Sequence, residues 1–232
     1  VPLTFDQDGV CTGCQVHEKK NAIDWEGRWE AFQQLVESYR ASNNYDILVP
    51  VSGGKDSYFQ VHKVIQLGLK PLLVTYHGNN YLPEGERNLF RMREVFDVDH
   101  IIVRPSVDVL VKMNRLGLLV QGDNNWHAHC GIFTVPIQVA VRYNVPLILW
   151  GEHGFSDLGG MYSYSDFVEF TAKHRLEHAL RGYDWYDFTD EGLEKLGHAS
   201  RRQGLTAKDL LWAQYPSDDE IDQVGVRGIY LS

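Results

Sequence analysis

The chain has 232 residues and is poor in cysteine, methionine and basic side chains. Its three cysteines are too few for a disulfide framework, and they suit a reducing compartment. No apolar run comes close to the ~20 residues that cross a bilayer, and no segment has the pattern of a secretory signal peptide. We therefore expect a cytoplasmic protein without a membrane partner.

The charge balance is acidic. Lysine and arginine total 22 against 31 aspartates and glutamates, which gives a net charge of -9. Nucleic-acid backbones are bound by basic surfaces, so we expect no nucleic-acid partner. Hydrophobic residues make up 44% of the chain and charged residues 23%, as in ordinary globular enzymes. The length allows one large domain with a small appendage.

Short apolar runs alternate with segments of helical periodicity. We expect strands at 46–51, 70–77, 101–105 and 147–150, and helices after Asp24 and at 57–67, 84–96, 107–119 and 132–143. The strands are continuous hydrophobic runs, which is typical of parallel strands buried between helices. The sequence therefore predicts an α/β fold with a doubly wound, mostly parallel sheet, whose ligand site lies at the carboxyl ends of the strands.

The two ends differ from this central pattern. Residues 1–23 lack apolar periodicity, so we expect a small separate segment there and the main domain over 24–232. From 155 onward the chain becomes polar and helical, with a capping box predicted at Ser217–Glu220. The chain does not begin with Met, and 228–232 reads as a strand stopped midway, so we expect a piece of a longer protein.

Residues 52–57, Ser-Gly-Gly-Lys-Asp-Ser, lie between the first predicted strand and a helix. The two glycines allow backbone amides to turn toward an anion, and the helix N-terminus adds positive charge. Lys55 supplies a cation, and the hydroxyls of Ser52 and Ser57 can donate hydrogen bonds. Asp56 fits beside an anion if Mg²⁺ is shared there. Neither the Walker spacing nor the dinucleotide fingerprint is met. The alternative is a plain glycine-rich turn.

Cys11 and Cys14 are spaced as half of a tetrahedral zinc site, with His17 and Cys130 as candidates for the other ligands. Two free surface thiols are the alternative. Cys130 lacks the glycines of a nucleophile elbow, which argues against a glutaminase nucleophile.

Several histidines and a glutamate are further candidates. His127 and His129 lie on one side if their segment is extended, where they could bind a metal or a substrate carboxylate; packed histidines are the alternative. Glu152 follows the fourth strand and could bind Mg²⁺ or orient a nucleophile, unless it is a solvated loop carboxylate. His174-Arg-Leu-Glu-His178 matches the inverted zinc-protease motif, but a solvated helix face accounts for it better.

The loop SGGKDS resembles the signature of the PP-loop ATP pyrophosphatases. That resemblance implies that the loop holds the β- and γ-phosphates of ATP, and that cleavage between the α- and β-phosphates gives an adenylated substrate and pyrophosphate. It places the adenine after the second strand. The implied ATP-binding residues are Ser52, Gly53, Gly54, Lys55, Asp56, Ser57, Thr75, Tyr76 and Gly151.

The chain also resembles the bacterial N-acetyl sugar amidotransferases of surface-polysaccharide (lipopolysaccharide O-antigen and nonulosonic acid) biosynthesis. The matching stretches are "FDQDGVCTGC", "VPVSGGKDS", "NNWHAHCGIFTVPIQVAVRYNVPLILWGEHGFSDLGGMYS" and "DLLWAQYPSDDEIDQVGVRGIYLS". The resemblance implies conversion of an acetamido group into an acetamidino group, through adenylation of the amide oxygen and replacement by ammonia. Catalysis would fall to Lys55, Asp56 and Glu152, and substrate binding to His127, His129 and His153.

The resemblance further implies ATP and Mg²⁺ at the site, and a structural Zn²⁺ on Cys11 and Cys14. The family carries another CxxC pair upstream, so the zinc-ribbon-like segment at 1–23 would be incomplete. Ammonia would come from glutaminase and cyclase-like partner subunits, and the oligomeric state stays open, with a homo-oligomer among the candidates. The main alternative is a PP-loop tRNA thiolation enzyme, in which Cys11, Cys14 and Cys130 would hold an iron–sulfur cluster. A non-catalytic nucleotide-binding module is the second.

Overall fold

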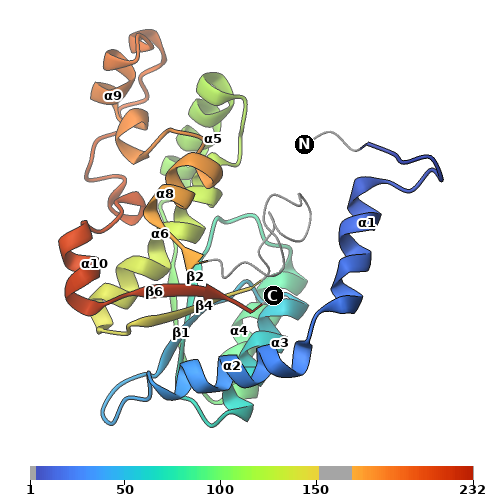
Figure 1. Ribbon diagram of the computed structural model, residues 1–232. Coiled ribbons are helices and arrows are strands. Elements are labelled where there is room, and N and C mark those ends of the chain that lie inside the picture. The colour runs from blue at the N-terminus through green and yellow to red at the C-terminus, as the bar shows by residue number, and fades with distance from the viewer. Residues whose placement is uncertain (1–3, 152–168, 232) are drawn as a thin grey trace.

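A six-stranded sheet forms the centre of the computed structural model, which describes residues 4–151 and 169–231 (Figure 1). The strand order is β3-β2-β1-β4-β6-β5, and every neighbouring pair is parallel except β5 and β6. The strands are β1 (Ile47–Pro50), β2 (Pro71–Tyr76), β3 (Asp99–Val103), β4 (Leu147–Trp150), β5 (Glu169–Phe170) and β6 (Arg227–Tyr230). The predicted α/β fold with a mostly parallel sheet is confirmed.

Helices cover both faces of the sheet. One face packs against α2 (Trp25–Glu37), α3 (Lys55–Gln66) and α4 (Pro83–Phe96), and the other packs against α5 (Val107–Gln121) and α6 (Trp126–Tyr143). Within β1, Ile47 and Val49 belong to the core under α2, α3 and α4, while Leu48 belongs to the core under α5 and α6. Because successive side chains of a strand point to opposite faces, a strand buried on both sides must be apolar throughout. This is why the hydrophobic runs were continuous.

The predicted caps are present. The Asp24 carboxylate accepts a hydrogen bond from the Gly27 amide at 2.9 Å and starts α2. Ser217 and Glu220 form a capping box at the start of α10 (Asp218–Val224).

Three elements begin two or more residues before the predicted start. Helix α3 begins at Lys55 rather than at 57, and β3 begins at Asp99 rather than at 101. Helix α6 begins at Trp126 rather than at 132, so the segment 127–130 is helical and not extended. Pro136 lies inside this helix. Burial of Trp126, Cys130 and Ile137 on one face outweighs the hydrogen bond that the proline removes.

Short helical segments make up about half of 169–231. They are α8 (Ala172–His174), a π-helical turn (Arg175–Ala179), α9 (Asp190–Lys195), α10 and 3-10 turns at Trp185–Phe188, Ala199–Arg201 and Leu211–Ala213. The segment was expected to be polar, but its leucines at 180, 193, 205 and 210 are buried with Phe188 in the α5–α6 core. Phe188 packs on Trp126, with ring centroids 4.1 Å apart.

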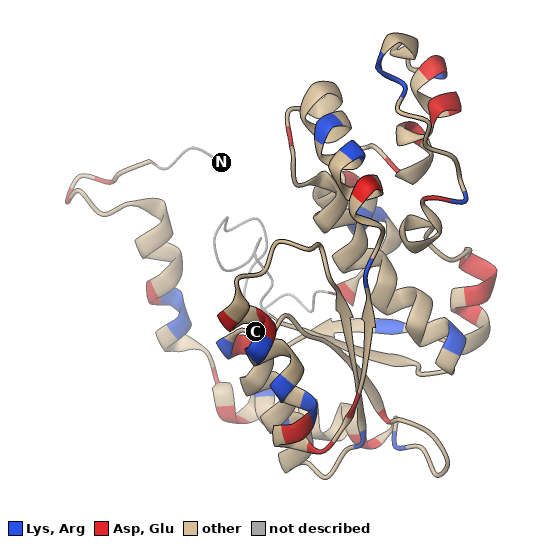
Figure 2. Ribbon diagram, turned by 180° about the vertical axis from the view of Figure 1, so that it is seen from behind, with Lys and Arg blue, Asp and Glu red and all other residues tan. Residues whose placement is uncertain are grey.

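The N-terminal helix α1 (Thr12–Lys19) is followed by a 3-10 turn (Lys20–Ala22), and neither has a buried residue. Figure 1 shows α1 extending away from the sheet. Acidic and basic residues intersperse along the described chain without gathering into a basic stripe (Figure 2). No helix within 4–151 or 169–231 is long and apolar enough to cross a membrane.

We predict that Phe188→Ala lowers the free energy of unfolding by about 3–5 kcal/mol, because it removes a fully buried ring that joins the C-terminal segment to α6. Urea denaturation followed by circular dichroism measures this. Phe59→Ala is the control: Phe59 is 55% exposed, so its loss should cost less than about 1 kcal/mol. Equal costs for the two variants would contradict the prediction.

Candidate functional site

The glycine-rich loop lies at the point where the order of the strands in the sheet reverses. β1 pairs with β2 on one side and with β4 on the other, and the connection from β1 runs to α3 on one face while α6 leads into β4 on the opposite face. In doubly wound sheets, such a switch point opens a crevice at the carboxyl ends of the strands. The loop after β1 lies at this crevice, with Gly54 as the N-cap of α3.

Gly53 has a conformation and a packing that exclude other residues. Its φ is +79°, and a Cβ there would lie 2.7 Å from both N and Cα of Leu89. Leu89 belongs to α4 and is fully buried. The loop is therefore held directly against the backbone of α4, which leaves its other side open toward the pocket.

Hydroxyl groups fix the rest of the loop. The Ser57 hydroxyl accepts a hydrogen bond from the Ser52 amide at 2.9 Å, and the two serine hydroxyls are 3.3 Å apart. Thr75 of β2 donates to the Val51 carbonyl at 2.6 Å. Thr75 is 2% exposed, so its side chain supports the loop from within, whereas the next residue, Tyr76, lines the pocket.

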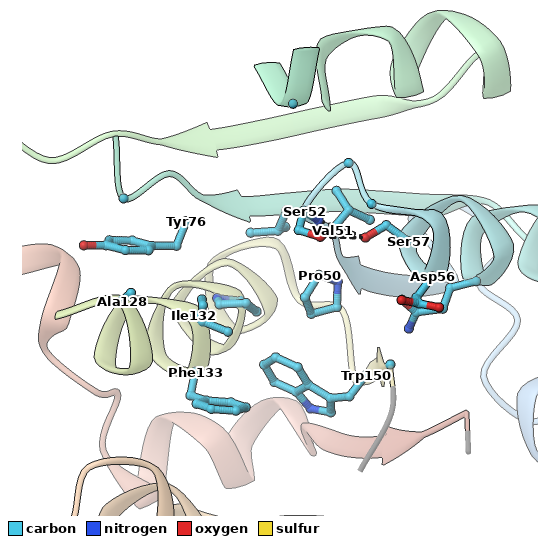
Figure 3. Close-up of a pocket in the computed structure, with 18 of the residues that line it drawn as sticks. Pro50, Val51, Ser52, Asp56, Ser57, Tyr76, Ala128, Ile132, Phe133 and Trp150 are labelled. Carbon is cyan, nitrogen blue, oxygen red and sulfur yellow. Dashed lines mark hydrogen bonds between the residues drawn. The ribbon is translucent and has the colours of Figure 1, made fainter. Parts of the chain in front are cut away.

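A pocket of about 840 Å³ opens in front of the loop, a size typical of small-molecule sites (Figure 3). Ser52, Asp56 and Ser57 form its polar end. Figure 3 shows Tyr76 and Ala128 at the opposite end, with Ile132, Phe133 and Trp150 along the side between them. The pocket therefore offers hydrogen-bond donors at one end and an apolar surface along one side.

Lys55 and Asp56 form an ion pair at the start of α3, with Nζ and Oδ1 2.7 Å apart. The two side chains are 89% and 60% exposed, and Asp56 lines the pocket. The lysine side chain is long enough to leave this pair for a phosphate oxygen. The gain from such an exposed pair is small, about 0–1 kcal/mol.

The helix points the two predicted histidines, His127 and His129, in different directions. His127 is 3% exposed, and its Nδ1 lies 2.9 Å from the Tyr76 hydroxyl. His129 is 42% exposed and lies 3.7 Å from the Asp123 carboxylate. Residues two apart on a helix point in different directions. The expectation that both lie on one side was wrong, because it rested on an extended segment.

Burial, with a smaller contribution from His129, lowers the pKa of His127 to about 4. Burial also raises the pKa of the Tyr76 hydroxyl. Both groups are therefore neutral near pH 7, and one proton is shared in a hydrogen bond between them. This contact fixes the Tyr76 ring at the wall of the pocket.

Cys130 is a packed thiol. It is fully buried, and burial raises its pKa to about 12 even though Arg175 acts to lower it. Its sulfur contacts the Arg175 guanidinium at 3.7 Å and the Ala213 carbonyl at 3.8 Å. Such a thiol is a poor metal ligand and a poor nucleophile. This counts against a cluster shared with Cys11 and Cys14.

Cys11 and Cys14 contact each other at the start of α1, where the Cys14 amide donates to the Cys11 sulfur at 3.4 Å. Hydrogen bonds from Cys14 lower the pKa of the Cys11 thiol. Among the described residues, no group of three or more His, Cys, Asp or Glu side chains is placed to hold a metal ion. The two thiols therefore remain half of a predicted zinc site.

The HxxEH stretch forms neither a protease site nor a solvated face. His174 is 8% exposed and lines the pocket, and its ring centroid lies 5.2 Å from that of His178. Arg175 is also buried and forms a bidentate ion pair with Asp184 at 2.9 and 3.1 Å. The expected solvated face was wrong for these two residues. Glu152 and His153 lie outside the described residues, whereas Gly151 lines the pocket.

Sequence reasoning missed several pocket residues. Gln60, Ile132, Phe133 and His174 line the pocket from three different helices. For Gln60 a signal was available, since it follows Asp56 by four residues and Ser57 by three, and therefore shares their face of α3.

No protein-family model and no curated protein matches the chain. Among solved structures, it is similar to an NH3-dependent NAD synthetase from Campylobacter jejuni, with 13% identity, a TM-score of 0.45, and coverage of 87% of this chain and 92% of that one. It is also similar to an NMN synthetase from Francisella tularensis, with 12% identity, a TM-score of 0.40, and coverage of 84% and 92%. Likenesses at this level do not bear on what this chain binds.

We predict that Gly53→Ala weakens pyrophosphate binding about 10-fold or more, because a Cβ pushes the loop off Leu89. Isothermal titration calorimetry measures the affinity. Gly68→Ala is the matched control at the other end of α3: its φ is +70°, but a Cβ there meets nothing within 4 Å. That variant should lose about 1 kcal/mol of stability and keep its affinity. Unchanged binding in Gly53→Ala would refute the loop assignment.

We predict a pH dependence of stability that passes through His127. Between pH 6.5 and 4 the imidazole of the unfolded chain becomes protonated, whereas the buried imidazole of the folded chain stays neutral. The free energy of unfolding therefore falls as the pH falls. Its contribution is at most about 1.4 kcal/mol per pH unit. His127→Gln should flatten the profile by that amount in urea titrations, while His62→Gln, at an exposed position, should leave it unchanged. Parallel profiles for wild type and His127→Gln would show that His127 does not contribute.

Proposed function

We propose that this chain is an ATP-dependent amidotransferase that converts the acetamido group of a bacterial surface-polysaccharide sugar into an acetamidino group. The observation that carries the proposal is the pocket itself. A loop of two glycines and two serines, rigid and open to one side, joins β1 to α3 at the switch point of the sheet and forms the polar end of a pocket of about 840 Å³. The resemblance of four sequence stretches to the N-acetyl sugar amidotransferases supports the choice of substrate.

In the proposed reaction, the amide oxygen of the sugar attacks the α-phosphorus of ATP. The O–Pα bond forms, the bond from Pα to the bridging oxygen breaks, and pyrophosphate leaves. Ammonia then adds to the imidate carbon, and loss of AMP gives the protonated acetamidine. An amide carbon is a poor electrophile, and adenylation makes its oxygen a leaving group.

The polar end of the pocket suits the departing pyrophosphate. The amides of Gly53 and Gly54 and the N-terminus of α3 would stabilise the charge that develops there, and Lys55 would add a cation. Asp56 lines the pocket beside these groups and would hold Mg²⁺, which when bound neutralises phosphate charge.

The apolar side of the pocket suits the imidate. Ile132, Phe133, Pro136 and Trp150 line the pocket there, and such a surface leaves little ordered water. Water would return the imidate to the acetamide, so its exclusion favours attack by ammonia. The ammonia would come from glutaminase and cyclase-like partner subunits, as the resemblance implies.

Mass spectrometry tests the proposal directly. Full-length protein is incubated with ATP, Mg²⁺, ammonium and a panel of acetamido uronates and nonulosonates. We expect one sugar to lose about one mass unit, because oxygen is replaced by NH, with one AMP released for each sugar converted. ATP binding without AMP or a shifted sugar, across the whole panel, would indicate a nucleotide-binding module instead.

In the same assay Lys55→Ala should lower kcat/KM about 100-fold or more through loss of charge stabilisation on the leaving group. Lys63→Ala, toward the other end of α3, serves as its control and should retain activity. Full turnover by Lys55→Ala would remove the lysine from the mechanism.

A further inference from the structure

Gln60 has unused hydrogen-bonding capacity inside the pocket. It is 3% exposed, and it lies on α3 within the pocket lining. Its Nε2 donates to the Leu149 carbonyl over a long 3.4 Å, and the structure gives its Oε1 no partner among the described residues. A carboxamide has two donor hydrogens and an acceptor oxygen, so Oε1 can accept a hydrogen bond from a group in the pocket.

The orientation of the carboxamide follows from its neighbours. The Leu149 carbonyl can only accept, so the nitrogen must face it. Oε1 lies next to Gly151, where an added Cβ would be 3.5 Å away. The oxygen therefore lies at the carboxyl end of β4, beside Gly151.

The position along α3 selects the group that Oε1 would meet. Gln60 shares the helix face of Asp56 and Ser57 and lies one turn, roughly 5 Å, further from the phosphate loop. If the loop holds the β- and γ-phosphates, the α-phosphorus and its attacking oxygen lie in the pocket that Gln60 also lines. This step rests on the proposed function.

We propose that Gln60 recognises the acetamido group of the sugar, with Oε1 accepting a hydrogen bond from its N–H. As the amide oxygen bonds to phosphorus, positive charge develops on that nitrogen and the N–H becomes a stronger donor. The hydrogen bond is then stronger in the transition state than in the ground state, so Gln60 raises the rate as well as the affinity. Gln60 is a specificity-determining residue for amides over esters.

The test removes the N–H from the sugar and the acceptor from the protein. The first probe is the acetamido sugar that the wild type converts, and the second is its O-acetyl counterpart, used as an inhibitor. The wild type should bind the ester about 10- to 100-fold more weakly than the amide. In Gln60→Met this preference should fall to near unity, and kcat/KM for the amide should drop about 100-fold while the Kd for ATP is unchanged.

A control variant keeps the test decisive. Gln66→Met, at the exposed end of the same helix, should behave as wild type. An unchanged preference for the amide in Gln60→Met would overturn the role of Gln60. Absence of amidine formation by the wild type would instead overturn the proposed function, and this inference with it.

Discussion

The candidate site depends on one contact between two stretches of backbone, Gly53 against Leu89. The 2.7 Å between a hypothetical Gly53 Cβ and the Leu89 backbone leaves no room for a side chain. Leu89 is itself fully buried in the core that joins α3 and α4 to the sheet. The loop therefore inherits the rigidity of that core, and the hydroxyls of Ser57 and Thr75 complete its support. A ligand binding there would pay little to order the backbone.

The sheet could be predicted because burial on both faces leaves a local signature. The side chains of β1 alternate between two cores, so its sequence is apolar throughout, and β2 follows the same pattern apart from Thr75. The start of α6 carries no comparable signature. Its first turn contains two histidines, and Pro136 follows within the same helix. What makes 126–131 helical is contact with the C-terminal segment, above all Trp126 on Phe188, and such contacts between distant residues leave no trace in local periodicity.

The candidate site also has one part that could be predicted from the sequence and one that could not. The glycine-rich loop is contiguous in sequence, and its place between a strand and a helix was predicted, although the helix start was placed two residues late. The apolar side of the pocket is formed by α6 and β4. The spacing of Ile132, Phe133 and Trp150 in the sequence does not indicate that they line one pocket. The interpretation of one cysteine and one histidine as ligands differs from the structure for a related reason. Cys130 and His127 look like ligands in the sequence, but burial beside Arg175 and Tyr76 makes them structural partners.

Net charge sharpens the argument on how a phosphate would be held. The chain carries a net charge of -9, and the one lysine of the loop contacts the carboxylate beside it. A long-range positive field is therefore a weak source of affinity. Backbone amides and the N-terminus of α3 act only at short range, and only in the conformation that Gly53 allows. Phosphate binding at such a site would depend on geometry more than on charge, and the close packing of Gly53 against α4 fixes that geometry.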